Sequence, residues 1–499
     1  MSWSSNVARL LSENCPTCGS PARLNLKHDD KKVLGILRAE QPLLEHEHDW
    51  VHQNIATLDD HLLSLRQSLC RLEFLTALIQ TQIDTTSTAK QQLESISAPI
   101  RRLPRDILLE IFSLCRPGLD HKPRLVARDY PWTLGHICHW WRDIVHSSPT
   151  LWSVVVLYPP YNPEIVETLL QRSGNVPLSV YIFVHHRGGS THSSTIIDRI
   201  MGLCHRWSKL ELHAHASLCV GPPYVDKLPS FFPHLRTLKV LGTWSSSIVP
   251  VLDAPLLKTV RLDDQLPLQS VPNHITHLAL SNLSIEELPM LLSFPNLVEL
   301  HFKVKYSTQD AAPTSTITHP TIRCLSVSGT SMLPFLTLPA LEHFQYVDRI
   351  RVNSVVSAFL SRSCCTLKTL LANMRYGDES FLELLGSQPS LCRLLIDPIG
   401  DCNHAVIRKL SSPDFLPNLE HLSFPYVDIE AVKMIRARWY TPMRCIRTFA
   451  IMDTSSKVVF MDSMEAMINE GLDVKVAEGP RRRELWLDPL MMETEDVLY

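Results

Sequence analysis

The residues of this chain whose types and spacing come nearest to a chemical site are two cysteines close to its start. Cys15 and Cys18 form a CxxC pair, which supplies two of the four ligands that a tetrahedral zinc ion needs. His28 lies nearby, but no second pair of cysteines or histidines follows at the spacing of a zinc finger. We therefore expect two free cysteines in a flexible N-terminal tail, residues 1–39, and no metal.

Patterns typical of catalysis do not occur in the rest of the sequence. It contains no GxSxG, HExxH or GxGxxG motif and no glycine-rich phosphate loop. Cys138, Cys364 and Cys365 have no neighbouring Cys, His or Asp pattern that indicates an activated nucleophile. The sequence predicts a protein that is not an enzyme, with no catalytic residue and no cofactor.

Composition indicates which kinds of partner and which cellular compartment to expect. The net charge of −3 gives no electrostatic reason to expect nucleic acid or an anionic membrane as a partner. No run of about 18 apolar residues predicts a membrane span, and the first residues lack the apolar core of a secretory signal. The 13 cysteines are scattered, which is typical of reduced thiols in the cytoplasm and/or nucleus. A chain of 499 residues suggests about three domains.

A stretch free of Pro and Gly between Pro42 and Pro99 carries an apolar repeat of 3.5 residues. Its positions step by alternating threes and fours, and one of them is polar: Ile55, Leu58, Leu62, Leu65, Leu69, Leu72, Thr76, Ile79 and Ile83. This period predicts a coiled-coil helix over residues 40–97. Self-association and an intramolecular helical hairpin are equally compatible with it.

The stretch from Ile100 to Trp152 predicts two helices with more apolar surface than they can bury alone. Leu103-Pro104 followed by Asp106 is a helix start, after which apolar residues recur at helical spacing to Leu114. A second helix is predicted after Pro131-Trp132, with one face that holds Leu134, Ile137, Cys138, Trp141, Ile144 and Val145. A unit of about 50 residues cannot enclose all these side chains, so we expect a partner groove to cover the excess.

Three motifs in this stretch together resemble an F-box, of the kind abundant in mushroom-forming fungi. They are Leu-Pro-Arg-Asp-Ile-Leu-Leu-Glu-Ile-Phe at 103–112, Ile-Cys-His-Trp-Trp-Arg at 137–142 and Pro-Thr-Leu-Trp at 149–152. Asp106 stands where the family more often has Glu, and the Arg116–Tyr130 loop is longer than in a minimal F-box. The resemblance implies a three-helix F-box over residues 98–152.

The resemblance also implies the partners. An F-box protein binds a Skp-type adaptor and, through it, a cullin, as the substrate receptor of an SCF ubiquitin ligase. The residues that the family motif assigns to adaptor binding are Leu103, Pro104, Ile107, Leu108, Ile111, Phe112 and Trp141. Some of them, Ile111 and Trp141 above all, are also suited to the core of the unit itself. The alternative function is a non-catalytic scaffold that binds the adaptor outside a ubiquitin ligase.

A six-residue unit, aliphatic-x-x-aliphatic-x-apolar, recurs from about residue 207 onward. Copies begin at Trp207, Leu235, Ile275, Leu297, Ile322, Leu341, Leu367, Leu391, Leu419 and Ile446, with a copy one residue longer at Leu256. Starts 19 to 28 residues apart are typical of leucine-rich repeats, which pair one short strand with one connector. The sequence therefore predicts an α/β fold: an irregular leucine-rich-repeat-like solenoid with parallel strands over residues 153–485, followed by a C-terminal tail, 486–499.

The connectors between the predicted strands are expected to differ in length and in secondary structure. Helices are expected at Ser284–Ser293, Val355–Ser363, Asp378–Gly386, Asp428–Arg438 and Met461–Gly471, with a last strand at Leu472–Val476. The connector near Leu252–Pro255 is too short for a helix. One face of the solenoid is therefore expected to be partly non-helical.

Side chains between the buried positions are expected to line up in two columns across the strands. The first is Thr237, His277, Glu299, Cys324, His343, Thr369, Arg393, His421 and Thr448, and the second is Lys239, His301, Ser326, Gln345, Leu371, Leu395 and Ser423. Their mixed chemistry suits recognition of an unknown protein substrate, and the candidates for its face are Thr237, Lys239, His277, Glu299, His301, His343, Gln345, Arg393 and His421. His277, His343 and His421 belong to non-adjacent repeats, so we do not expect a metal there.

Overall fold

A computed structural model covers the 499-residue chain. It describes residues 30–39, 42–116, 130–158, 162–184, 194–214, 231–241, 253–262, 268–304, 316–347, 353–374, 379–398, 404–424, 429–441, 445–451 and 464–476. Cys15, Cys18, most of the Arg116–Tyr130 loop and the predicted C-terminal tail lie outside the described residues. The chain divides into two compact units, Met1–Leu103 and Pro104–Tyr499.

The described part of the first unit is helical. α2 spans Asp30–Leu37, α3 spans Glu45–Ser97, and the 3-10 helix η1 spans Pro99–Arg102. α3 confirms that the stretch free of Pro and Gly forms one continuous helix, and it ends just before Ala98 because a residue that precedes proline disfavours helical backbone. None of the described helices combines the length and the apolarity that crossing a membrane requires.

The second unit begins with short helices. α4 spans Arg105–Leu114, α5 Trp132–Gly135, α6 His139–His146 and the 3-10 helix η2 Pro149–Trp152. Pro104 caps α4 with extended backbone, and Asp106 lies in the first turn, where the helix dipole favours a negative charge. Because α6 begins at His139, Ile137 precedes the helix instead of sharing its buried face, and Ile137 is exposed.

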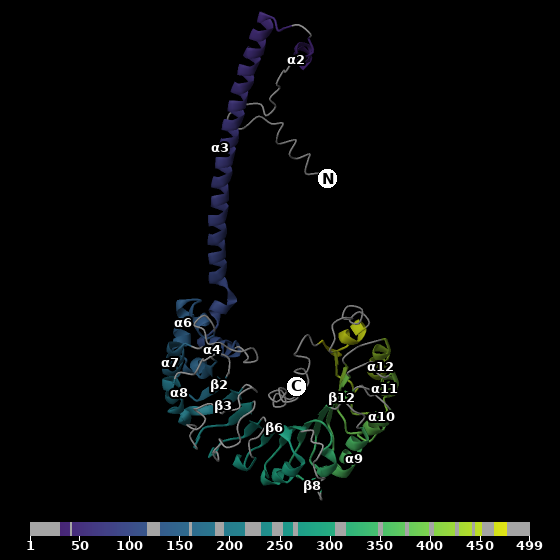
Figure 1. Ribbon diagram of the computed structural model, residues 1–499. Helices are drawn as coiled ribbons and strands as arrows, with labels where there is room; N and C mark the ends of the chain where they lie inside the picture. The colour runs from purple at the N-terminus through teal and green to yellow at the C-terminus, as the bar shows by residue number, and fades with distance from the viewer. Residues whose placement is uncertain are drawn as a thin grey trace. The chain divides into compact units, whose positions relative to one another are not determined.

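A parallel sheet of 14 strands forms the rest of the described second unit. Its strands pair in chain order, and β8 and β10 form a separate parallel pair. In Figure 1, the labelled helices α7 to α12 lie on the opposite side of the strands from the concave face of this unit. The strands are β1 Val154–Leu157, β2 Leu178–Val184, β3 Trp207–Ala214, β4 Thr237–Leu241, β5 Thr259–Leu262, β6 His277–Leu283, β7 Glu299–Val304, β8 Ile317–Thr318, β9 Cys324–Ser328, β10 Leu336–Thr337, β11 His343–Val347, β12 Thr369–Met374, β13 Arg393–Pro398, β14 His421–Phe424, β15 Thr448–Ile451 and β16 Asp473–Val476.

The connectors between these strands change character along the unit, as the sequence predicts. Their described helices are α7 Pro163–Arg172, α8 Ser194–Met201, η3 Cys204–Arg206, η5 Leu268–Ser270, η6 Ile285–Ser293, η7 Leu333–Phe335, α9 Asn353–Ser363, α10 Glu379–Gly386, α11 His404–Leu410 and α12 Ile429–Trp439, and residues 464–469 are also helical. The predictions for α9, α10 and α12 are confirmed. The stretch at Ser284–Ser293 is a 3-10 helix and not an α-helix, because Pro289 lies inside it.

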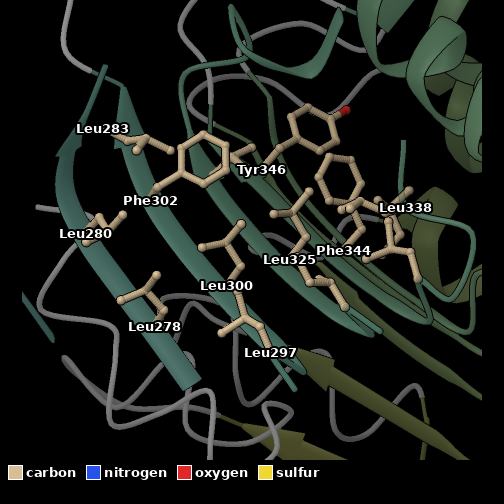
Figure 2. Packing of buried hydrophobic residues seen from close by; sticks show 14 of the residues in the cluster. Leu278, Leu280, Leu283, Leu297, Leu300, Phe302, Leu325, Leu338, Phe344 and Tyr346 are labelled. Carbon is tan, nitrogen blue, oxygen red and sulfur yellow. The ribbon is translucent and has the colours of Figure 1, made fainter. Parts of the chain in front are cut away.

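The apolar positions of the repeats form a continuous core beneath the sheet (Figure 2). Leu278, Leu300, Leu325 and Phe344 occupy the same place on neighbouring strands, and each is at most 1% exposed. Full burial of such a side chain contributes about 1.5–3 kcal/mol. Because each side chain is covered by its counterpart on the next strand, a unit reaches this stabilisation only within the stack.

One prediction about the repeats needs correction. The copy around Leu256 is not one residue longer, because Leu257 is buried at 0% exposure while Leu256 is 43% exposed. It therefore reads Leu257-Lys-Thr-Val260-Arg-Leu262, like the other copies. The array includes β1 and β2, which lie within the predicted bounds 153–485, although neither strand carries the six-residue unit whose first recognised copy begins at Trp207.

Two buried arginines and one half-buried arginine link successive connectors. Arg206, Arg362 and Arg438 each lie at the end of a helix and donate to backbone carbonyl groups 22 to 33 residues earlier. Arg362, for example, donates to the carbonyls of Leu333 at 2.6 Å and Leu336 at 2.8 Å. Each arginine thus satisfies the carbonyl groups that a helix or turn of the preceding unit leaves without a partner.

Arg438 is the strongest case and gives a stability prediction. Its guanidinium donates to the carbonyls of Leu410, Ser412, Phe415 and Leu416, and burial lowers its pKa to about 10. Substitution with Met leaves these buried acceptors unpaired, so we expect Arg438→Met to lower the free energy of unfolding by about 3–5 kcal/mol.

Urea unfolding of the full chain measures this change. The matched control is Arg436→Met, since Arg436 lies two residues earlier on the same helix with an exposed side chain. The control is expected to change the unfolding free energy by less than about 1 kcal/mol. Equal losses for the two variants would contradict the role assigned to Arg438.

Candidate docking sites

A small core fixes the geometry of the helical segment at residues 105–152. Leu108 and Phe112 of α4 and Trp141 of α6 are at most 9% exposed, and the Phe112 and Trp141 ring centroids are 4.7 Å apart. Trp152 of η2 is fully buried, and its Nε1 donates to the carbonyl of Val145 at 2.8 Å. These contacts hold α4, α6 and η2 as one packed body.

Polar contacts at the helix ends complete this body. Arg105 Nη2 donates to Ser147 Oγ at 2.6 Å, which links the start of α4 to the end of α6. Arg142 Nε donates to the carbonyl of Gly135 at 2.9 Å, and the Trp141 amide contacts Cys138 Sγ at 3.5 Å. The Cys-x-x-Trp-Arg motif therefore has a local structural role, because it caps α6 and joins it to α5.

The seven residues predicted to bind an adaptor differ in exposure. The interior residues are Leu108, Phe112 and Trp141. Leu103 and Ile111 are half-buried, and Pro104 and Ile107 are exposed. Leu103 belongs to the first compact unit and the other six to the second. The three interior side chains pack within the segment and support its surface.

Three exposed apolar residues of the same segment were not among those predicted. Leu114 is 78% exposed, Ile137 55% and Trp140 40%, and Ile107 is similar at 46%. We call these four residues the apolar rim. Ile107 and Leu114 lie on α4, Trp140 lies on α6, and Ile137 lies two residues before α6 begins. The Phe112–Trp141 contact joins these two helices. Ile107 and Leu114 are seven residues apart, so their spacing alone could have placed them on one face of α4. Trp140 and Trp141 are the same residue type, so the sequence could not show which of them is exposed.

The strand register places the two predicted columns side by side on the face of the sheet opposite the apolar core. It confirms their order and adds Lys209, Thr259 and Asp473 to the first, and Glu211, Arg261, Ala279, Ala450 and Lys475 to the second. Of the substrate-face candidates, the half-buried ones are Thr237, His277, His343, Arg393 and His421, and the buried ones are Lys239, Glu299, His301 and Gln345. The first column is thus the more accessible of the two.

Glu211 is the centre of a charged cluster on β3 and β4 that the sequence did not single out. Lys209 Nζ lies 3.1 Å and Lys239 Nζ 3.3 Å from Glu211 Oε1, and His213 Nε2 lies 3.2 Å from Oε2. Burial alone would raise the pKa of Glu211, but the His213 hydrogen bond and the two lysine charges outweigh it and lower that pKa to about 2. The carboxylate is therefore charged and held in place at neutral pH.

A second cluster joins three of the predicted residues on β6 and β7. Glu299 contacts His301 Nε2 through Oε1 at 2.5 Å and His277 Nε2 through Oε2 at 3.5 Å. His277 also has its Nδ1 2.7 Å from Thr276 Oγ1. Among the residues that the structure describes, no group of three His, Cys, Asp or Glu side chains is arranged to hold a metal ion. The cluster thus orients its imidazole rings through a buried carboxylate.

An aromatic row lies beside the Glu211 cluster at the start of the sheet. The Tyr158 and Phe183 ring centroids are 5.4 Å apart, and those of Phe183 and His213 are 4.3 Å apart and stacked. All three side chains are half-buried. Sequence reasoning missed this row because β1 and β2 do not carry the recurring six-residue unit.

No protein-family model matches this chain, and no curated protein matches it.

The low pKa of Glu211 gives a pH-dependent prediction. Because its folded-state pKa of about 2 lies below the ordinary 4.5, the ionised carboxylate stabilises the fold above pH 4.5. This contribution, about 3 kcal/mol, is lost as the pH falls toward 2. We expect Glu211→Gln to lower the unfolding free energy at pH 7 and the difference from the unaltered protein to shrink below pH 4.5.

Urea unfolding at several pH values measures this difference. The control is the exposed Glu379→Gln on α10, for which no comparable pH-dependent loss is expected. A Glu211→Gln deficit that stays constant from pH 7 to pH 3 would show that the cluster does not stabilise the charged carboxylate.

Proposed function

We propose that this chain is an F-box substrate receptor of an SCF-type ubiquitin ligase. In this proposal the helical segment at residues 105–152 docks on a Skp-type adaptor, and the concave face of the parallel sheet recruits a protein substrate. The observation that carries the proposal is the apolar rim, because it lies on the segment whose motifs resemble an F-box. The chain itself contributes position and no chemical group to the reaction.

The apolar rim is best explained by a partner. Its four side chains are 40–78% exposed although buried Leu108, Phe112 and Trp141 lie on the same helices. The segment therefore has a filled core and a separate set of apolar residues that this core does not use. Apolar side chains left on a rigid support in this way are typical of a docking surface.

The sheet supports the second half of the proposal. Ser326 Oγ, Gln345 Nε2 and Ser423 Oγ are buried polar atoms of the second column, and none has a hydrogen-bond partner among the residues that the structure describes. Most buried polar groups in proteins are paired, so these side chains would gain a hydrogen bond if they turned toward a polar group bound on the sheet. The backbone or side chains of a protein segment lying across the strands would supply such partners.

Adaptor binding is tested by substitutions on the apolar rim. We expect Ile107→Asp to weaken binding of the full chain to a purified Skp-type adaptor by about 10-fold or more, because a carboxylate replaces an apolar contact. Its thermal unfolding is expected to stay unchanged, since Ile107 is 46% exposed. Isothermal titration calorimetry and thermal unfolding provide the two readouts.

Two control variants make this test specific. Leu292→Asp removes a similarly exposed leucine, at 53%, from η6 and is expected to leave adaptor binding intact. Leu108→Ala empties an interior site and is expected to lower the unfolding free energy by about 2–5 kcal/mol. Undiminished adaptor binding by Ile107→Asp would contradict the assignment. Adaptor binding without co-purification of a cullin would instead support the scaffold function outside a ligase.

A further inference from the structure

A regular row of apolar side chains lies exposed along the central part of α3. We call it the seam: Leu62, Leu65, Leu69, Leu72, Thr76, Ile79 and Ile83. Its six leucines and isoleucines are 42–62% exposed. The structure describes every residue of Glu45–Ser97, and no side chain of this helix is buried. The half-buried side chains of α3 all lie between Glu47 and His61, before the seam begins.

We propose that the seam binds the same seam of a second copy of this chain. Its positions alternate steps of three and four residues without interruption, which gives a period of 3.5. A helix with this period presents a straight row only to another helix that supercoils with it. An identical chain has the matching period by construction, so the row is complementary to itself.

The polar member of the seam can be buried without leaving a donor unpaired. Thr76 Oγ1 donates to the carbonyl of Leu72 in its own helix at 2.9 Å. The hydroxyl is therefore satisfied before any partner arrives, and the Thr76 methyl group can face the partner helix. The usual penalty for burying an unpaired hydroxyl does not apply at this position.

Charge along the seam is compatible with an identical partner. From His61 to Gln82, the positions that flank the seam carry two formal charges of opposite sign, Arg66 and Glu73. In a parallel, aligned pair Arg66 lies opposite His61 and Glu73 opposite Ser68, so like formal charges do not meet at neutral pH. Two identical copies therefore bring no like charges together at these flanking positions.

The area of the seam is sufficient for a stable pair. Burying seven side chains on each of two chains would remove on the order of 1,200 Å² from water, the lower end of standard stable interfaces. α3 has 53 residues, so in an aligned pair both helices extend beyond the seam at each end.

Light scattering of the full chain tests the proposal. We expect a mass twice the 56.7 kDa of one chain. Leu72→Asp, which alters a seam residue that is 62% exposed, is expected to raise the dissociation constant about 100-fold or more. Phe74→Asp removes an equally apolar side chain, 64% exposed, from outside the seam and is expected to leave the mass doubled.

A second pair of variants acts in the opposite direction. Thr76→Ile is expected to lower the dissociation constant about 10-fold, because an apolar side chain replaces a hydroxyl within the seam. Thr81 makes the same kind of bond, from Oγ1 to the carbonyl of Ala77 at 2.9 Å, but lies outside the seam, so Thr81→Ile is expected to have no effect. A single-chain mass for the unaltered protein at all concentrations overturns the proposal, as do equal effects within either matched pair.

Discussion

Stacking of one strand on the next is the interaction on which the second unit depends. Its strands are short, and the apolar side chains of each are covered by those of its neighbours. An array held together in this way needs a cover at each end. At the start, Trp152 is fully buried directly before β1, and the Arg172 guanidinium of α7 lies 4.5 Å from its ring centre. At the far end, Trp439 Nε1 donates to Glu470 at 2.9 Å.

The cover at the start also connects the two candidate docking sites. Trp152 belongs to the segment that carries the apolar rim, and the chain runs from it through one residue into β1. Trp152 also contacts α7, the connector between β1 and β2, because the Arg172 guanidinium lies over its ring. The helical segment is therefore in direct contact with the first connector of the sheet. In an adaptor-bound receptor this coupling would fix the direction in which a substrate is presented.

Sequence patterns predicted the elements that repeat and missed the contacts that join them. The recurring aliphatic triplets located most strands because each triplet has to be buried, whereas β1 and β2 lack that unit. Leu256 and Leu257 are chemically alike, so their exposure was decided by the turn before β5. An arginine near a helix end, such as Arg438, reads as a surface charge in a sequence. Its true role depends on carbonyl groups 22 to 28 residues away, which sequence spacing does not reveal.

The columns of the sheet impose different conditions on a partner along their length. Near β3 and β4, Glu211 already holds Lys209, Lys239 and His213, so a partner that displaced one of them would leave a buried carboxylate less compensated. Farther along, Ser326 and Gln345 carry buried polar atoms that no hydrogen bond within the described part of the chain satisfies, so turning these side chains toward a bound partner would break no such bond. In the proposed receptor, polar recognition would therefore be favoured from β9 onward, and the ion pairs before it would disfavour partners whose charges compete with them.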